Sequence, residues 1–395
     1  MPLRLVVAAT HPVQYQAPYF RALAARPELD LEVWYVFLPS EEEQGKDFST
    51  AFSWDVPVLD GYRWQVLDCV RRTGSSPYGF GAYSAPGLSR KLEDERPDAV
   101  LVTGWQSRVL VQVARAAGRY GVPRLLRGES NDLRRRPFVV RMAHRLFFRW
   151  FDAFLAIGRA NRRLYERAGV PQRKIVETPY AVDNERFREA ALRLRPRRED
   201  LRAEWGFGRD AFCVLFAGKL EPKKRPLDVL DALEVARRER LELRLLVAGS
   251  GELEAVLRDR ARERRLPVTF AGFLNQTEMP RAYAVADALV LPSDSGETWG
   301  LVVNEAMASG VPAIVSDRVG CREDLVEEGM TGFSFPLGDT RALATCLVIL
   351  AADPSRAAAM GELARARVST SYSIDAAVAG TLAAISTAMG GRPPR

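Results

Sequence analysis

Short apolar runs alternate with amphipathic helical patterns along almost the whole chain, and no other feature of the sequence limits the possible folds as strongly. In the first half, the runs at residues 5–10, 31–37 and 97–102 have the length of strands and are mostly apolar. Strands of this kind are typical of parallel sheets that helices cover on both faces. The sequence therefore predicts an α/β fold with doubly wound sheets.

The alternation is interrupted once, between residues 184 and 204. This stretch is rich in arginine and glutamate and contains no strand-like run, whereas a strong apolar strand pattern resumes at residues 211–217. A chain of 395 residues is long enough for two domains that each bury a core. We expect a first domain over residues 1–200, a second over 201–373, and a separate C-terminal helix and tail over 374–395.

The composition is that of a soluble globular protein, with 47% hydrophobic and 27% charged residues. No run reaches the roughly 18 apolar residues that predict a membrane-spanning helix, and the apolar N-terminus is too short for a signal peptide. The chain has four scattered cysteines and only two histidines, so we expect neither a disulfide framework nor a metal site. These features favour a cytoplasmic protein.

The stretch from Leu291 to Arg318, LPSDSGETWGLVVNEAMASGVPAIVSDR, has the pattern of a strand end, a polar loop, a helix and a second strand. Glu297 lies in the loop, and Glu305 lies about two turns along the helix. Between them, the backbone N–H groups of Gly300, Leu301 and Val302 would point out of the helix N-terminus, where an anion such as phosphate is favoured. A sugar linked to a nucleoside diphosphate has the complementary groups in the same order: the hydroxyls of the sugar, the charged diphosphate, and the hydroxyls of the ribose.

A second candidate anion site is the segment FAGKLEPKKRP at residues 216–226, which follows a strand. It contains Gly218 and presents Lys219 and Lys224, which would neutralise a diphosphate and stabilise it as a leaving group. The alternative interpretation is a solvated charged turn. The position directly after the first strand of the second domain favours the anion site.

These residues resemble a known family. Glu297 and Glu305, with seven residues between them, resemble the E-x7-E motif of retaining glycosyltransferases of family 4, which have the GT-B fold. Gly218 and Lys224 resemble that family's G-R-L-x3-K motif, with Lys219 where arginine is usual, so the charge is kept but the bidentate fork is lost. The resemblance implies two Rossmann-like domains facing a central cleft, with the acceptor on the first, the nucleotide sugar on the second, and the last helix crossing back.

The resemblance also implies roles for individual residues. Glu297 would contact the sugar hydroxyls and, with Lys219 and Lys224, would be catalytic, while Glu305 would contact the ribose. The remaining donor-binding positions surround the diphosphate and the base, which family members hold largely through main chain: Gly218, Gly249, Gly251, Phe273, Leu274, Gly300, Leu301 and Val302.

In the N-terminal half, the pattern H-P-x-Q-Y places His11 and Gln14 after the first strand, at the edge where open α/β sheets bind ligands. An alternative for His11 is a polar strand-end residue that bonds to its own turn. Many family members carry an active-site histidine after the strand that here ends near Arg127, but this chain has Glu129 in that loop. We interpret His11 and Gln14 as candidate contacts of the acceptor in the cleft of the N-terminal domain, and Glu129 as a candidate contact of either the acceptor or the donor.

The predicted function is transfer of a sugar from a nucleotide-diphosphate sugar to a saccharide or lipid-linked acceptor with retention of configuration, without metal or other cofactor. Two alternatives share the fold: a sugar-nucleotide epimerase, and a non-catalytic homologue that acts as a partner subunit. The net charge of +7 also suggests nucleic-acid binding. The chain has no recognised nucleic-acid-binding motif, so no nucleic-acid partner is expected.

Residues 134–150 form a basic stretch in which arginines are interleaved with large apolar residues. One interpretation is docking to an anionic membrane to reach a lipid-linked acceptor, which would place the protein peripherally at the inner face of that membrane. The other is a helix that packs its apolar side on the sheet. We favour packing, because a helix is needed there to cover the sheet.

Overall fold

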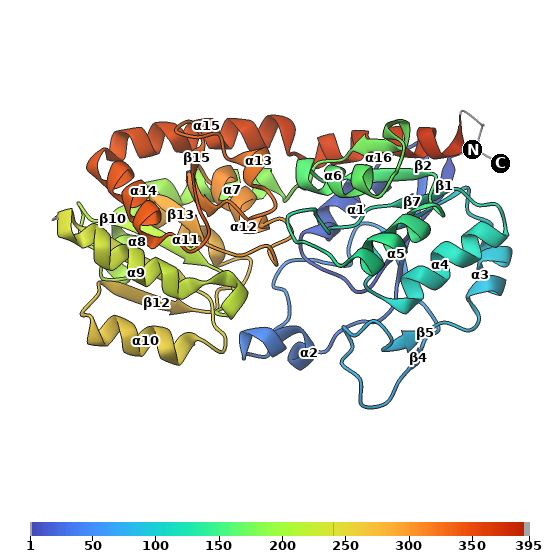
Figure 1. Ribbon diagram of the computed structural model, residues 1–395, viewed down its shortest axis with the longest axis horizontal. Helices are drawn as coiled ribbons and strands as arrows, with labels where there is room; N and C mark the ends of the chain where they lie inside the picture. Colours follow the sequence, from blue (N-terminus) through green and yellow to red (C-terminus); the bar gives the residue numbers. More distant parts are fainter. Residues whose placement is uncertain (1, 240, 391–395) are drawn as a thin grey trace. The chain divides into compact units, whose positions relative to one another are not determined.

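The structure is a computed structural model that describes residues 2–239 and 241–390, so the end of the predicted tail lies outside the described residues. Its contacts divide the chain into two compact units. The first unit comprises residues 1–43, 57–180 and 374–395, and the second comprises residues 44–56 and 181–373. Each unit is built around one parallel sheet with helices on both faces (Figure 1). The predicted class, two doubly wound Rossmann-like α/β domains, is confirmed.

The sheet of the first unit has seven strands in the order β3-β2-β1-β6-β7-β8-β9, and all its neighbours are parallel. β1 lies inside the sheet, where Leu5 is paired with Leu31 on one side and with Ala99 on the other. The strands are β1 (Leu3–Ala9), β2 (Leu29–Tyr35), β3 (Arg63–Val66), β6 (Ala99–Val102), β7 (Arg124–Leu126), β8 (Ala153–Ala156) and β9 (Ile175–Glu177). A separate antiparallel pair is formed by β4 (Val70–Arg71) and β5 (Tyr83–Ser84).

Alternate residues of β1 enter two different cores, as the period of a strand requires. Leu5 and Val7 pack with α1 (Gln16–Ala24) and α16 (Ile374–Met389), whereas Val6 and Ala8 pack with α3 (Leu88–Glu95) and α4 (Arg108–Arg119). α16 is further tied to α1 by a buried hydrogen bond of 2.6 Å between the hydroxyls of Tyr19 and Thr381. The last helix is thus part of the first unit's core. The other helices of the first half are α2 (Glu41–Gly45), α5 (Phe138–Phe148) and α6 (Arg159–Arg167).

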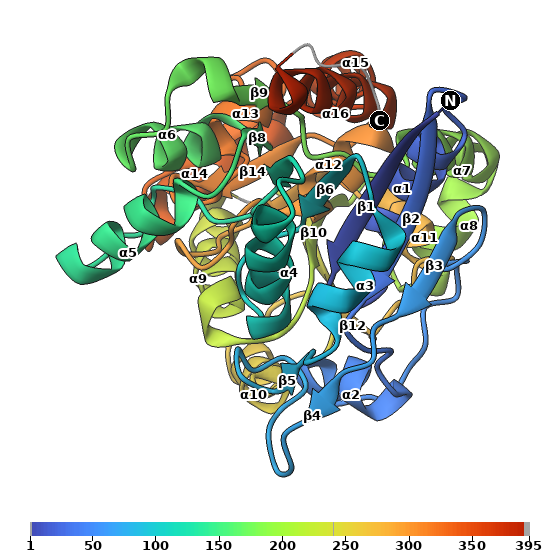
Figure 2. The same cartoon turned by 90° about the vertical axis from the view of Figure 1, so that its right-hand side faces the viewer.

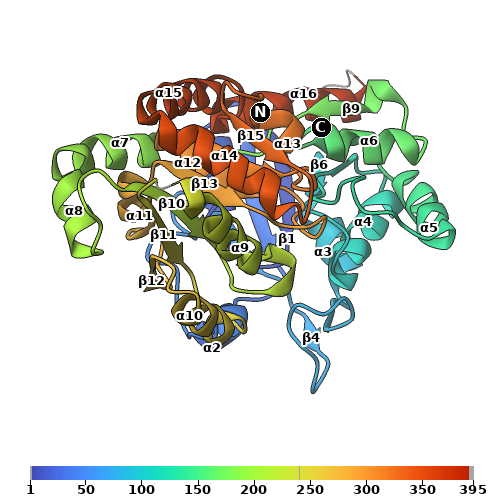
Figure 3. The same ribbon diagram turned by 60° about the vertical axis from the view of Figure 1, so that its left-hand side comes forward.

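The sheet of the second unit has six parallel strands in the order β12-β11-β10-β13-β14-β15. They are β10 (Phe212–Ala217), β11 (Leu243–Ala248), β12 (Val268–Gly272), β13 (Ala288–Leu291), β14 (Ala313–Ser316) and β15 (Gly332–Phe335). Figure 3 shows α9 and α14 side by side, and both contribute to the core of this unit. Its helices are α7 (Asn184–Leu194), α8 (Arg198–Glu204), α9 (Pro226–Ala236), α10 (Glu254–Glu263), α11 (Met279–Val285), α12 (Leu301–Ala308), α13 (Arg322–Leu325), α14 (Thr340–Ala352) and α15 (Pro354–Ser371).

The arginine-rich stretch that marked the predicted boundary is helical and belongs to the second unit. Asp183 caps α7 by accepting a hydrogen bond of 3.1 Å from the Arg186 N–H. In α8, the buried Arg202 side chain donates to the carbonyl of Val285 and to Asp287. The charge composition suggested a domain boundary, but arginines such as Arg202 bond within the second unit. The division between the units therefore falls after Tyr180, earlier than residue 200.

The prediction that the basic stretch packs its apolar side on the sheet is wrong. Phe148 is the only buried residue of α5, and the exposed fractions of Phe138, Val139 and Leu146 are 70%, 76% and 57%. Phe148 anchors the C-terminal end of the helix by packing against Trp105. The rest of α5 stands out from the sheet (Figure 2).

Within the described residues, no individual helix combines the length and the apolar character that crossing a bilayer requires. By length and composition, α14 and the helical residues Pro354–Met389 meet this test only as a pair that is bent by 103°.

Candidate active site

The candidate donor residues of the second unit gather at the carboxyl ends of β10, β11 and β13. β10 lies between β11 and β13. From β10, the chain first adds β11 and β12 on one side of the sheet and then β13, β14 and β15 on the other, so the strand order reverses at β10. In open parallel sheets, ligands bind outside the carboxyl ends of the strands where the order reverses. The loops that follow these three strands therefore occupy the expected position for a ligand site.

Lys224 and Glu297 come from two of these loops and form an ion pair. The Lys224 ammonium donates to Glu297 Oε2, and the two side chains are only 15% and 14% exposed. Ser293 Oγ donates to the same carboxylate oxygen at 3.4 Å. The backbone N–H of Asp294 donates to the carbonyl of Lys223 at 2.9 Å, which ties the two loops together. The structure thus brings together two predicted site residues that are far apart in the sequence.

Gly300 allows the loop after β13 to turn directly into α12. Its φ is +101°, and a Cβ atom there would lie 2.8 Å from Leu291 and 3.1 Å from Val319, so a larger residue does not fit. Among the described residues, no side chain caps α12 at its N-terminus. Leu301 and Val302 lie in the first turn, where the N–H groups of a helix have no carbonyl partner within it and where anions bind in other proteins.

Glu305 is buried on α12, and its Oε2 accepts a hydrogen bond of 2.7 Å from the hydroxyl of Tyr283. Burial raises the pKa of Glu305, although Tyr283, Arg186 and Gln276 oppose the shift. Arg186 in turn donates to the side chain of Gln276 at 2.5 Å. Sequence reasoning missed Tyr283, Arg186 and Gln276, because each comes from a different segment and none belongs to a recognisable motif.

The glycine-containing loops after β10 and β11 meet backbone to backbone. The N–H of Gly218 donates to the carbonyl of Ala248, and the N–H of Leu220 donates to the carbonyl of Ser250, both at 2.9 Å. Gly249 has a φ of +148°, and a Cβ atom there would lie 1.9 Å from the carbonyl oxygen of Gly218. The close approach makes Gly249 a structural requirement for joining the two loops. Gly251 lies in the same turn.

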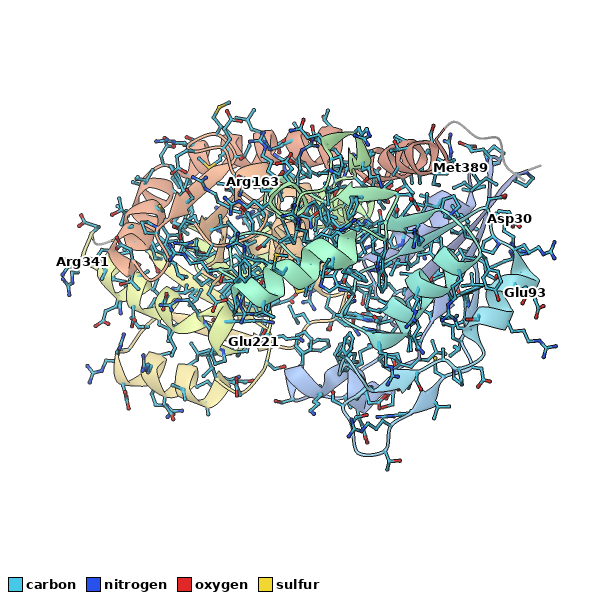
Figure 4. The ribbon with its side chains drawn as sticks, turned by 45° about the vertical axis from the view of Figure 1, so that its right-hand side comes forward. Asp30, Glu93, Arg163, Glu221, Arg341 and Met389 are labelled. Carbon is cyan, nitrogen blue, oxygen red and sulfur yellow. The ribbon has the colours of Figure 1, made fainter. Side chains whose placement is uncertain are left out.

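The two predicted catalytic lysines have different partners. The Lys219 ammonium lies 5.1 Å from the ring centroid of Phe48, whereas Lys224 pairs with Glu297. The Lys223 ammonium forms an ion pair with Glu221 Oε1 at 3.1 Å. Figure 4 labels Glu221. Part of the charge of this loop is therefore balanced locally. Phe273 follows β12, next to Leu274, and its ring centroid lies 5.0 Å from that of Phe48.

In the first unit, His11 has the environment of a structural residue. Its Nδ1 lies 3.0 Å from the hydroxyl of Thr10, and its ring packs against Phe37 and Tyr78. Burial lowers the pKa of His11 to about 4, so the ring is neutral at pH 7. These contacts agree with the alternative of a strand-end residue that bonds locally. Nearby in sequence, the buried Oε1 of Gln14 has no hydrogen-bond partner among the described residues.

Glu129 lies in a cluster of aromatic residues that the sequence did not reveal. It accepts hydrogen bonds from the hydroxyls of Tyr15, at 3.3 Å, and of Tyr180. The buried guanidinium of Arg127 lies between two rings, 4.9 Å from the centroid of Tyr19 and 4.8 Å from that of Tyr180. Burial raises the pKa of Tyr15 and Tyr180, and the charge of Glu129 adds to this effect. Tyr15 belongs to the H-P-x-Q-Y pattern, which is the one signal that could have pointed here.

A search of the described residues for metal ligands finds no group of three or more histidine, cysteine, aspartate or glutamate side chains that could hold a metal ion. The four cysteines are unpaired thiols, three of them buried.

Two family models match the chain, and together they cover most of it. The model described as "Glycosyl transferase 4-like domain" matches residues 13–181, and "Glycosyl transferases group 1" matches residues 197–367.

Curated relatives are similar over part of the chain. Glycogen synthase of Mycobacterium tuberculosis is 35% identical over 161 residues, which are 40% of this chain and 38% of the relative. A GDP-mannose-dependent alpha-(1-6)-phosphatidylinositol monomannoside mannosyltransferase of Mycolicibacterium smegmatis is 30% identical over 238 residues, 58% of this chain and 60% of the relative. The matched segment thus spans between about two fifths and three fifths of these relatives.

Solved structures show the same fold over almost the full length. HepE of Anabaena in complex with UDP has a TM-score of 0.71 at 18% identity, covering 97% of this chain and 99% of that one. A glycosyltransferase of Rickettsia africae has a TM-score of 0.72 at 13% identity, covering 99% and 100%.

Proposed function

Because this chain belongs to the glycosyltransferases that the group 1 and 4-like family models describe, we propose that it transfers a sugar from a nucleotide-diphosphate sugar to an acceptor. The observation that carries this proposal is the Lys224–Glu297 pair beside the uncapped N-terminus of α12. Cation, carboxylate and backbone amides stand where the strand order reverses. Backbone amides and a cation bind a diphosphate, and a carboxylate accepts hydrogen bonds from the hydroxyls of a sugar.

In this proposal, the diphosphate binds to the N–H groups of Leu301 and Val302 and to Lys224, with Lys219 adding positive charge. These donors stabilise the negative charge that develops on the leaving nucleoside diphosphate. The relatives named above include a GDP-mannose-dependent enzyme, and one of the similar structures contains UDP. We propose the same class of ligand, a nucleoside diphosphate, for this chain.

Glu297 is proposed to accept hydrogen bonds from hydroxyls of the donor sugar. Its partner Lys224 would turn to the diphosphate when the donor binds, because a diphosphate carries more negative charge than one carboxylate. The carboxylate would then be free to orient the sugar. Glu305, held by Tyr283, is proposed to bind the ribose hydroxyls.

The acceptor is proposed to bind to the first unit, near His11, Gln14 and Glu129. Two observations support this position: the unpartnered buried oxygen of Gln14, and the cluster of Glu129 with tyrosine hydroxyls and Arg127. Aromatic rings and charged hydrogen-bonding groups are suited to a saccharide, which has polar hydroxyls and apolar C–H faces. We propose a saccharide or lipid-linked acceptor and retention of the anomeric configuration.

The test begins with nucleotide binding. The full chain is titrated with UDP, GDP, ADP and dTDP, each in a thermal-shift assay, and the nucleotide that raises the melting temperature is then supplied as its sugar conjugate in a transfer assay. The proposal expects one nucleotide to stabilise the fold and its sugar conjugate to be consumed with release of the diphosphate. A chain that none of these nucleotides stabilises, at millimolar concentration, would contradict it.

We also propose that the protein contacts a membrane through α5. The exposed apolar residues Phe138, Val139 and Leu146 alternate with exposed arginines, among them Arg141 and Arg145. Such a helix can insert its apolar side at the surface of a bilayer while its arginines meet anionic headgroups. The same arginines disfavour an apolar protein partner.

A pocket of about 610 Å³ beside α5 supports an anionic surface as the partner. Its lining is strongly basic and includes Arg134, Arg135, Arg136, Arg141, Arg167 and His144. Asp132 is the acidic residue of the lining, and it already pairs with Arg163 at 3.0 Å and with Arg167 at 2.9 Å. The pocket therefore keeps an excess of positive charge for a phosphate headgroup.

Vesicle sedimentation tests this contact. The protein should bind vesicles that contain phosphatidylglycerol, bind vesicles of phosphatidylcholine alone far less, and dissociate as salt is raised. Val139→Asp should abolish the binding, while Leu192→Asp, at an apolar residue of α7 that is also exposed, should leave it unchanged. Equal binding to both kinds of vesicle, or equal loss in both variants, would contradict the proposal.

A further inference from the structure

Residues 44–56 come from the N-terminal half of the sequence but belong to the second unit. We call this segment the 44–56 strap. Its anchors follow β11 and β12: Ser250 Oγ donates to the carbonyl of Phe48 at 2.5 Å, and Asn275 Nδ2 donates to the carbonyl of Ser53 at 2.7 Å. Asp55 accepts from the backbone N–H of Thr277 at 3.1 Å. The strap is therefore attached at the edge of the sheet where the proposed donor site lies.

Four aromatic rings fix the strap on the second unit. The ring centroids of Phe52 and Phe273 are 4.4 Å apart, and the ring centroid of Trp54 lies 5.0 Å from that of Phe52. Phe52 is buried and provides the packing that holds the segment. Phe48 is only partly buried, with its ring 5.0 Å from that of Phe273.

Phe48 contacts both ends of the proposed nucleotide site. Lys219, next to Gly218, marks the side of the diphosphate, and Phe273, after β12, marks the side of the base. The Lys219 ammonium lies 5.1 Å from the Phe48 ring centroid, and the same ring meets Phe273 edge to face. In a nucleoside diphosphate, the ribose connects the base to the diphosphate. A nucleotide with its diphosphate at Lys219 and its base near Phe273 would therefore lie against the Phe48 ring.

We propose that Phe48 is a donor-binding residue that stacks on the nucleobase, and that the 44–56 strap holds it in place. The inference rests on the proposed function. An aromatic face binds any base without reading its edge, so Phe48 supplies affinity, and the main chain near Phe273 is left to select the base. Residues 181–373 by themselves, without the 44–56 strap, would therefore form an incomplete donor site.

The experiment compares a nucleoside diphosphate with inorganic pyrophosphate, using the full chain and isothermal titration. Phe48→Ala should weaken binding of the preferred nucleoside diphosphate by about tenfold, the order of one aromatic–base stack, and should leave pyrophosphate binding within about twofold. Phe48→Tyr keeps the ring and should bind as the parent does. Phe80→Ala removes an exposed phenylalanine of the first unit and is the matched control.

Three results with Phe48→Ala would overturn the inference. Unchanged nucleotide binding in Phe48→Ala would show that the ring only packs, and an equal loss for both ligands would place its effect on the phosphates. Tighter nucleotide binding would show that Phe48 occupies the position of the nucleoside.

If Phe48→Ala does not fold, Phe48→Leu is the second variant. Leucine keeps much of the bulk without the flat ring, so Phe48→Leu should show the same selective loss of nucleotide binding. A parent chain that binds pyrophosphate but no nucleoside diphosphate would overturn the proposed function as well, whereas the other results concern Phe48 alone.

Discussion

Both units place polar residues at the carboxyl edge of a parallel sheet, but they do so by different means. In the second unit, the site is made by backbone that turns sharply at Gly249 and Gly300 and by charged residues within the same short loops. In the first unit, Glu129 is surrounded by Tyr15, Arg127 and Tyr180, which come from widely separated segments. The first arrangement leaves a pattern in the sequence, and the second leaves almost none.

The comparison predicts that changes in the second unit affect donor chemistry, while changes in the first affect the acceptor. The largest effect is expected from Glu297→Gln, which removes the negative charge but keeps the size of the side chain. Transfer should fall by about a thousandfold, the order seen when one preorganised polar group of an active site is lost. Nucleoside diphosphate binding should persist, because Lys224 remains. Turnover within threefold of the parent would remove Glu297 from the proposed mechanism.

Lys224→Ala should have the next largest effect. It removes a charged contact to the diphosphate, so nucleotide affinity should fall by about 10- to 100-fold, in line with a charge-assisted hydrogen bond. It also leaves the largely buried Glu297 carboxylate without its cationic partner, so the melting temperature should drop. Lys219→Ala provides the comparison, since Lys219 contacts Phe48 and its loss should cost less. Identical titrations of the parent and Lys224→Ala would contradict the assignment.

Glu129→Gln tests the first unit. The amide can still accept from Tyr15 and Tyr180, but the charge beside Arg127 is lost. We expect kcat/KM for the acceptor to fall by about tenfold with no change in nucleotide affinity, as when one hydrogen bond to a charged group is lost. An equal loss of nucleotide affinity would contradict the proposal that the first unit binds the acceptor and the second binds the donor.

His11 should affect stability rather than transfer. Its pKa is lowered from 6.5 to about 4 in the folded protein, so between these values the unfolded chain binds a proton that the folded chain does not. The free energy of unfolding therefore falls as the pH falls through this range. Urea unfolding at neutral pH and near pH 4.5 should show a smaller loss for His11→Gln than for the parent. Equal losses in the two proteins would show that His11 titrates normally.

The smallest effect is expected from removing divalent metal. Transfer measured with and without a chelator should agree within about twofold, because lysines and backbone amides are proposed to balance the diphosphate charge. Lost activity that Mg²⁺ restores would require a metal beside the diphosphate.

The sequence predicted the fold class and the alternation of strands and helices over most of the chain, because apolar runs set the strands, and glycine and proline set the loops around them. The resemblance to a known family, rather than any local pattern, assigned Lys224 and Glu297 to one donor site. The sequence could not predict that Tyr283 bonds to Glu305, or that Tyr180 bonds to Glu129, because each contact joins side chains from separate elements. Composition also misled twice. The arginine-rich residues 184–204, where a domain boundary was expected, lie within the second unit, and the basic helix α5 does not pack its apolar side on the sheet.

The position of α16 has a consequence for how the protein is made. The first unit's sheet is complete after β9, yet one of its two cores includes Ala377, Ala384 and Ile385 from the last helix. During synthesis, every residue of the second unit leaves the ribosome before those three do. The sheet of the first unit therefore keeps apolar surface exposed until α16 has been synthesised, whereas the second unit can complete its folding before then.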